Sequence, residues 1–179
     1  YKTVLTHGWV VDGQGRAMHK SLGNSVAPEE VIKKYGADLL RLWVASSDYH
    51  ADVRVSDDIF KQLSQAYLKI RNTARYILGN LNGFDPDNLV PASEMNELDK
   101  WAVSRLNDLM KKVRDGYENY AYHIVYHAIR NFCVVDMSNF YLDIVKDVLY
   151  CDSANGKARR SAQTAMFLVL AFPDTCVHC

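Results

Sequence analysis

One short segment near the beginning of the chain holds most of the residue types that can do chemistry. Residues 12–24 read Asp-Gly-Gln-Gly-Arg-Ala-Met-His-Lys-Ser-Leu-Gly-Asn, so that glycines flank the basic side chains of Arg16, His19 and Lys20. Such a loop can fold over a polyphosphate, because backbone N–H groups donate hydrogen bonds and lysine supplies a point charge. This chemistry suits a reaction that expels pyrophosphate, since negative charge must be stabilised as the leaving group departs. A solvated turn has the same composition, and the loop alone does not decide between the two.

The elements around the loop are predicted from hydrophobic patterns and from residues that begin or end helices. Residues 3–11 are rich in β-branched and aromatic side chains, which predicts a strand ending at the loop. Pro28, the acids that follow it and a closing Gly36 predict a short helix, and a second helix is expected over 37–46. The pattern breaks over 48–56, and we place a domain boundary there.

Beyond this boundary the apolar residues recur every three or four positions, which predicts amphipathic helices. We expect helical regions over residues 59–81, 97–120, 122–150 and 157–170. Asn96 is the expected N-cap of the second region. The third is longer than an ordinary helix, so a kink or break is expected near residues 136–139. The predicted fold class is mainly α, with an antiparallel helical bundle.

Composition and charge exclude several classes of protein. The chain has 21 basic and 21 acidic side chains, so any contact with nucleic acid must come from a local patch. No apolar run is long enough to span a membrane. Its four cysteines are too few and too irregular for a disulfide framework. The tail from Cys176 to Cys179 has only half of a zinc site, and the pair His123 and His127 lacks a third ligand, so we expect no metal site.

Several motifs occur in an order that is more specific than any one of them. They are KSLGN at 20–24, VAP at 26–28, YGADLLRLW at 35–43, DYHADVRVS at 48–56, IRNTAR at 70–75, NFCVVDMS at 131–138 and FYLDIVKD at 140–147. Together they resemble the class I aminoacyl-tRNA synthetases, and within that family the isoleucine enzymes, over roughly residues 4–170. The loop is similar to the KMSKS signature of that family.

This resemblance implies a division of the chain into three parts. Residues 1–55 would be the C-terminal end of a Rossmann-type catalytic domain, with the KMSKS-type loop and stem-contact helices. Residues 56–170 would be the helical anticodon-binding domain, and residues 171–179 are an unassigned tail that does not resemble the family.

The resemblance also implies roles for residues of the loop. Lys20 corresponds to the second lysine of the signature, which steadies the triphosphate during amino-acid activation, and it is the expected catalytic residue. Met18, His19 and Ser21 would complete the ATP loop, while Gly23 and Asn24 would shape it. The first lysine of the signature is Ala17 here and its serine is His19. Whether Arg16 or His19 supplies the missing charge stays open.

The helical part is expected to bind the anticodon arm of tRNA(Ile). The candidate phosphate contacts are Lys69, Arg71, Arg75, Lys111, Lys112 and Arg130, with Lys61 and Arg114 also basic. Candidates for stacking on unpaired bases are Trp101, Tyr117, Tyr120, Tyr122 and Tyr126, although aromatic residues at helical spacing are usually core. Asp143 and Asp147 with Lys146 are interpreted as a solvated charged face rather than a catalytic pair.

The parent enzyme implied by the resemblance is an isoleucine–tRNA ligase that uses ATP and Mg²⁺. The upstream nucleotide signature, the amino-acid pocket and the editing domain are absent, so we predict a fragment that is inactive alone and holds no bound cofactor. We also expect a monomer in the cytoplasm that binds no DNA and no membrane. The alternatives are a fragment of a valyl- or leucyl-tRNA synthetase, or a helical protein–protein interaction module.

Overall fold

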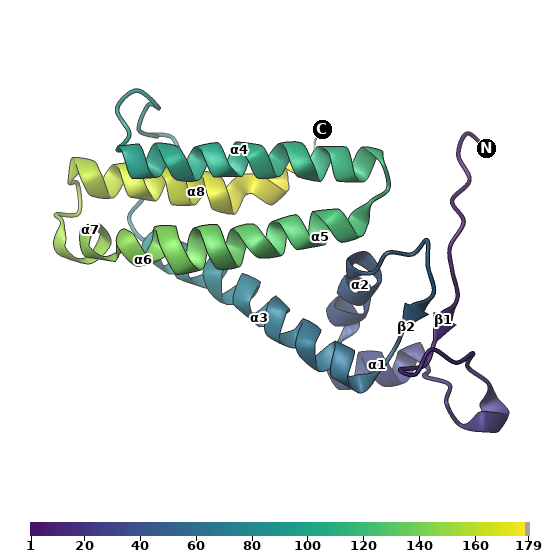
Figure 1. The fold of residues 1–179 in the computed structure, drawn as a ribbon. Helices are drawn as coiled ribbons and strands as arrows, with labels where there is room; N and C mark the ends of the chain where they lie inside the picture. Colours follow the sequence, from purple (N-terminus) through teal and green to yellow (C-terminus); the bar gives the residue numbers. More distant parts are fainter. Residues whose placement is uncertain (178–179) are drawn as a thin grey trace.

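The computed structural model describes residues 1–177, with side chains described as far as Ala171, and it is mostly helical (Figure 1). Its helices are α1 Pro28–Tyr35, α2 Ala37–Ser46, α3 Asp57–Asn80, α4 Glu97–Glu118, α5 Tyr122–Asn131, the π-helix η2 Phe132–Tyr141, α6 Leu142–Ile144, α7 Lys146–Cys151 and α8 Lys157–Val177. The predicted mainly α fold is confirmed. Within the described residues, no helix is long and apolar enough to cross a membrane.

The strands are much shorter than the sequence pattern predicts. Strand β1, Val10–Val11, pairs in parallel with β2, Val53–Arg54, in a two-stranded sheet, and Val11 also forms an isolated antiparallel bridge with Ala17. The predicted strand over 3–11 is therefore wrong in its length, and residues 1–7 are exposed. Strands of parallel sheets are normally covered and paired on both sides. The neighbouring strand β2 is only two residues long, so residues 1–7 lead away from the helices as an extended chain (Figure 1).

A small apolar cluster joins the loop region to the first long helix. Its buried residues are Val31, Leu39, Trp43, Val55, Phe60 and Leu63. Phe60 and Leu63 lie near the start of α3, so this helix closes the cluster. The indole Nε1 of Trp43 donates a hydrogen bond of 3.2 Å to the backbone oxygen of Arg54, which satisfies its polar atom within the cluster.

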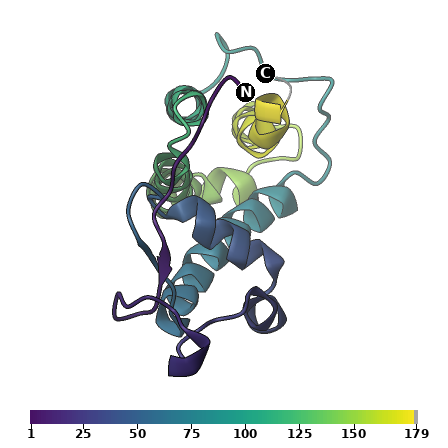
Figure 2. The same ribbon diagram turned by 90° about the vertical axis from the view of Figure 1, so that its right-hand side faces the viewer.

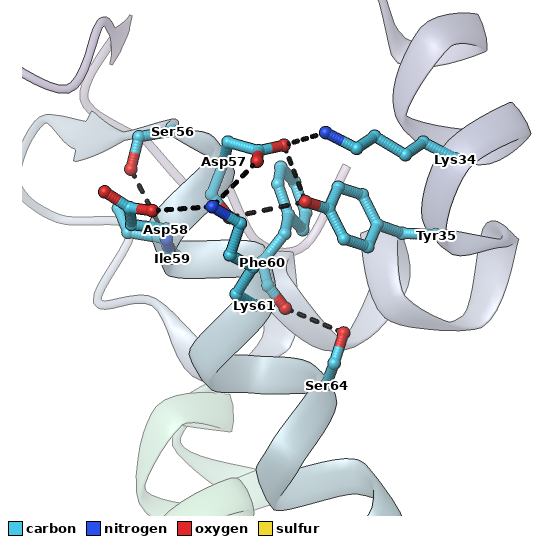
Figure 3. A network of polar contacts seen from close by, with 9 residues as sticks. All are labelled: Lys34, Tyr35, Ser56, Asp57, Asp58, Ile59, Phe60, Lys61 and Ser64. Atoms are coloured by element: carbon cyan, nitrogen blue, oxygen red, sulfur yellow. Dashed lines mark hydrogen bonds and ion pairs between the residues drawn. The ribbon is translucent and has the colours of Figure 1, made fainter.

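A polar network fastens α1 to the start of α3 (Figure 3). The Asp57 carboxylate accepts hydrogen bonds from Lys34 Nζ at 2.5 Å and from Tyr35 Oη at 2.6 Å. Lys61 Nζ also lies 3.2 Å from Asp57 Oδ2. These donors, Lys34 first, hold the pKa of the Asp57 carboxyl well below its usual range. Just before it, Ser56 caps the helix by accepting a hydrogen bond from the backbone N–H of Ile59 at 3.4 Å.

The main core lies inside the bundle, where α4 packs against both α5 and α8 (Figures 1 and 2). Ala102, Leu106, Leu109 and Val113 of α4 are buried there. Ile77, near the end of α3, belongs to this core, whereas the first turns of α3 belong to the smaller cluster. Helix α3 therefore connects the loop region to the bundle, because its first turns pack in the small cluster and its last turns pack in the main core.

The third predicted helical region is divided by a π-helix rather than by a kink. It begins at Phe132, four residues before the expected break, and the N–H of Leu142 bonds to the oxygen of Met137, five residues back. Asn96 precedes α4 as expected, but its side chain makes no capping hydrogen bond. Instead its backbone N–H donates to Ser161 Oγ at 2.9 Å.

Two helix ends also differ from the sequence pattern. The helix expected to reach residue 120 ends at Glu118, and Tyr120 takes a left-handed φ of 56° in the turn before α5. The last helix continues past the expected residue 170 to Val177. The His178 and Cys179 half of the considered zinc pattern lies outside the described residues.

Candidate nucleotide loop and RNA-binding face

The buried carboxylate of Asp12 organises the beginning of the loop. Its Oδ1 accepts hydrogen bonds from the backbone N–H groups of Gln14 and Arg16, both at 2.9 Å. Its Oδ2 accepts from Arg16 Nε at 2.9 Å and from Asn24 Nδ2 at 3.0 Å. These donors, led by the backbone N–H of Arg16, hold the pKa of the Asp12 carboxyl far below its usual range. The group therefore stays ionised at neutral pH and fixes the turn.

The side chain of Asn24 closes the loop at its other end. Besides the bond to Asp12, its Nδ2 donates to the backbone oxygen of Ala17 at 3.1 Å. Its Oδ1 accepts from the backbone N–H of His19 at 2.9 Å. Gly23 beside it has a φ of 64°, a left-handed angle that glycine adopts without strain. The expectation that Gly23 and Asn24 shape the loop agrees with this geometry.

The predicted ATP-loop residues lie where the closed loop presents them outward. Lys20 and Ser21 begin a 3₁₀ turn, η1 Lys20–Leu22, and together with His19 they are exposed. Within the described residues, the Lys20 ammonium has no hydrogen bond or ion pair. Met18 is half-buried and packs against the small apolar cluster. The structure thus anchors one side of the loop and leaves the charge of Lys20 available.

The charge of Arg16 is already used inside the loop. Its guanidinium Nη2 lies 2.9 Å from Asp12 Oδ2, in addition to the hydrogen bond from Nε. Replacement of the signature's missing lysine by Arg16 would require this pair to break. His19 has no such partner in the described chain.

The predicted phosphate-binding residues are all exposed, but they do not form one patch. None of the six candidates makes an ion pair within the described part of the chain: Lys69, Arg71, Arg75, Lys111, Lys112 and Arg130. Unpaired and exposed cations suit phosphate contacts. On α3, however, Lys69 and Arg71 are two residues apart and so point about 200° away from each other. Lys61, by contrast, is paired with Asp57 and Asp58.

The candidate stacking residues divide into packed and exposed ones. Trp101 packs edge-on against Phe140, with ring centroids 4.8 Å apart, and Tyr126 packs against the small apolar cluster. Tyr117 is 58% exposed and touches Tyr122 edge to face. Only exposed rings can stack on an unpaired base, so Tyr117 is the better candidate among them.

Two expectations concerned pairs of charged or metal-binding residues. Lys146 Nζ lies 2.5 Å from Asp143 Oδ1 in an exposed pair, as the interpretation of a solvated charged face implies. Among the side chains that the structure describes, as far as Ala171, no cluster of three or more His, Cys, Asp or Glu residues could hold a metal ion. His123 and His127 therefore have no further ligand beside them in that part of the chain.

Comparisons with known proteins match both parts of the chain. Residues 1–56 match the family described as tRNA synthetases class I (I, L, M and V), and residues 99–172 match the anticodon-binding domain of tRNA ligase. The isoleucine–tRNA ligases of Syntrophotalea carbinolica and Geobacter sulfurreducens are 60% and 58% identical over 171 residues. That alignment covers 95% of this chain and 18% of each relative. By sequence, the chain belongs to the isoleucine–tRNA ligase family.

The fold agrees with this membership. A crystal structure from Agrobacterium radiobacter K84, described as a LeuRS–tRNA–LeuAMS ternary complex, superposes with a TM-score of 0.66. The superposition covers 93% of this chain and 20% of that one at 22% identity, so the likeness concerns the fold alone. The relatives that are 56–60% identical are isoleucine–tRNA ligases. The valyl, leucyl and interaction-module alternatives are therefore not favoured.

Proposed function

We propose that the chain serves isoleucine–tRNA ligase by presenting the ATP-site loop and by holding the anticodon arm of tRNA(Ile). The parent enzyme would attach isoleucine to that tRNA with consumption of ATP. The single observation that carries this proposal is the 60% identity with an isoleucine–tRNA ligase over 171 residues, which runs through the loop and the bundle alike. The chain spans about a fifth of the relative's length.

In this proposal Lys20 is the catalytic residue of the chain. Its ammonium is exposed and unpaired among the described residues, so it can meet the phosphates of ATP as negative charge develops on the leaving pyrophosphate. Met18, His19 and Ser21 would line the same nucleotide site. Both oxygens of Asp12 are taken up by hydrogen bonds, so this carboxylate offers no oxygen ligand for Mg²⁺. The ion that the family implies would therefore not be held by Asp12.

The bundle supplies the proposed RNA-binding surface. Six exposed cations of α3, α4 and α5 make no ion pair within the described residues, so their phosphate contacts would cost no existing pair: Lys69, Arg71, Arg75, Lys111, Lys112 and Arg130. We place the boundary between the two functions at residue 55, just before α3. A monomer in the cytoplasm, with no DNA or membrane partner, agrees with this role.

The experiment that tests the proposal is a binding titration of the 179-residue chain with anticodon stem–loop RNAs. We expect the isoleucine anticodon to bind more tightly than the valine and methionine anticodons, with an affinity that falls steeply as salt rises. Equal affinity for all three would contradict the isoleucine assignment. No measurable binding would contradict the RNA-binding role.

A second measurement tests the expectation that the chain alone is inactive. Isoleucine-dependent exchange of pyrophosphate into ATP should be undetectable with this chain, because a partial site cannot preorganise the transition state. Measurable exchange by the purified chain would show that the catalytic part has been placed wrongly.

A further inference from the structure

A polar cavity of about 360 Å³ opens between α3 and the π-helix η2. The residues around it are Lys69, Asn72, Thr73, Tyr76, Val134, Ser138, Asn139, Leu142 and Lys146. Pockets that bind small organic molecules have volumes of roughly 300–1,000 Å³, so this one is near the lower end. It has room for a single nucleotide.

Most of the polar groups around the cavity are not used by the fold. The Lys69 ammonium, the Asn72 and Asn139 amides and the Ser138 hydroxyl make no hydrogen bond or ion pair within the described residues. Thr73 differs, because its hydroxyl donates to the backbone oxygen of Lys69 at 2.9 Å. These four side chains are exposed at the cavity, so they are free to hydrogen-bond with a ligand that enters it.

The π-helix places the polar side chains of Ser138 and Asn139 at the cavity. In an α-helix, residues five apart are rotated by about 140° about the axis, so Val134 and Asn139 would face different directions. The i to i+5 repeat of the π-helix places them on one side, together with Ser138. π-Helical turns are rare and occur frequently at functional sites, and here the turn forms one wall of the cavity.

The charges at the cavity favour an anion. Lys69 comes from α3 and Lys146 from the start of α7, so two cations from different elements meet at one opening. Lys146 is paired with Asp143, but that pair is exposed, with side chains 48% and 63% accessible. Exposed pairs of this kind contribute little to stability, so a phosphate can compete for Lys146. The ring of Tyr76 adds a flat apolar surface to the same wall.

We propose that this cavity takes one unstacked nucleotide of the bound RNA, with its phosphate at Lys69 and Lys146 and its base edge at Asn72 and Asn139. Amides suit a base edge because each one both donates and accepts hydrogen bonds. The proposal rests on the proposed function, since it requires the bundle to bind an RNA stem–loop. It adds a particular site, in which Lys146 contacts RNA rather than only forming a surface ion pair.

The test compares cavity variants with matched controls in stem–loop titrations followed by fluorescence anisotropy. Lys69→Gln should weaken binding by about 5- to 10-fold and reduce the salt slope by about one, as expected for a lost phosphate contact. Asn139→Ala should weaken binding by a similar factor with the salt slope unchanged. Lys33→Gln on α1 and Asn107→Ala on α4 change the same residue types at exposed positions away from the cavity, and should bind like the unsubstituted chain.

RNAs with an abasic site at each loop position complete the design. One position should lose its effect on affinity when Asn139→Ala is present, because that base and that amide then share one contact. If cavity and control variants bind alike, or no abasic position depends on Asn139, the cavity assignment is overturned. Equal competition by an acidic peptide would likewise overturn it in favour of a general anion site. Failure of the unsubstituted chain to bind any stem–loop would instead overturn the proposed function. Circular dichroism of each variant confirms that it is folded.

Discussion

Replacement of Asp99 tests whether a buried polar network holds the bundle together. Asp99 is 2% exposed on α4. Its Oδ1 accepts a hydrogen bond from Tyr141 Oη and its Oδ2 accepts one from Ser161 Oγ, both at 2.6 Å. The carboxylate therefore links α4 to the π-helix η2 and to α8. Burial, with the neighbouring Asp99 charge, raises the pKa of the Tyr141 hydroxyl, so that tyrosine stays a donor over the whole physiological range.

The cost of Asp99→Ala follows from what each partner would lose. A hydrogen bond to a charged group contributes about 1.5–3 kcal/mol, and a buried group without its partner costs about 1–3 kcal/mol. Ser161 Oγ would keep the bond from the Asn96 N–H at 2.9 Å, whereas Tyr141 Oη would keep only a long contact of 3.5 Å with the oxygen of Ala162. Removal of a buried charge offsets part of the loss. We expect a decrease of about 3 kcal/mol in the free energy of unfolding.

The assay is urea unfolding of the 179-residue chain followed by circular dichroism, with the m-value checked for each variant. The corresponding decrease in Tm is roughly 6–12 °C, at about 2–4 °C per kcal/mol for a chain of this size. Tyr141→Phe removes the donor and gives the second corner of a double-mutant cycle. The loss for the double variant should be smaller than the sum of the single losses, because the two groups satisfy each other. A loss below about 1 kcal/mol for Asp99→Ala, or strict additivity, would refute the network as a source of stability.

Three further predictions concern the loop and the contact between α4 and α5. Because the pKa of the Asp12 carboxyl is lowered, its contribution to stability is fully present above the usual value of 3.8 and is lost as pH falls through the lower folded value. An NMR titration should therefore show Asp12 ionised at pH values where exposed carboxyls are protonated, and Asp12→Asn should speed hydrogen exchange at the Arg16 amide. Gly116→Ala should cost about 1–3 kcal/mol in thermal unfolding, because the new Cβ would lie 2.5 Å from Val125 Cγ2, and Val125→Ala should restore part of the loss. Lys20→Ala should leave stem–loop affinity and Tm unchanged while it lowers isoleucine activation in the full-length ligase, and a large loss of RNA affinity would argue against its assignment to ATP.

Helices of the chain were predictable wherever local signals agreed with one another. The helix that begins at Pro28 and closes before Gly36, and the one over Ala37–Ser46, have the predicted bounds because proline, glycine and the apolar period act within a few residues. The strand before the loop was predicted too long, since a strand exists only where a neighbour pairs with it. The π-helix was anticipated only as an irregularity, because nothing in the local sequence distinguishes a widened turn from a break.

In the loop, too, some features could be predicted from the sequence and others could not. Its glycines, its basic residues and the position of Lys20 could be recognised from the sequence, since those residues are adjacent in the chain. The pairing of Arg16 with Asp12 could not, because a charged side chain near a possible phosphate site gives no sign of which anion it meets.

Only the tertiary structure decided which exposed cations share a site. Lys69 and Lys146 are 77 residues apart in the sequence, and both line the cavity that forms where α3 packs against the π-helix. Arg71, close to Lys69 in sequence, points to another side of the helix. The sequence by itself thus determined the family, most of the helices and the position of Lys20 in the loop, since these depend on local order and identity. The polar cavity and the Asp99 network depend on contacts between distant segments, which exist only once the helices have packed.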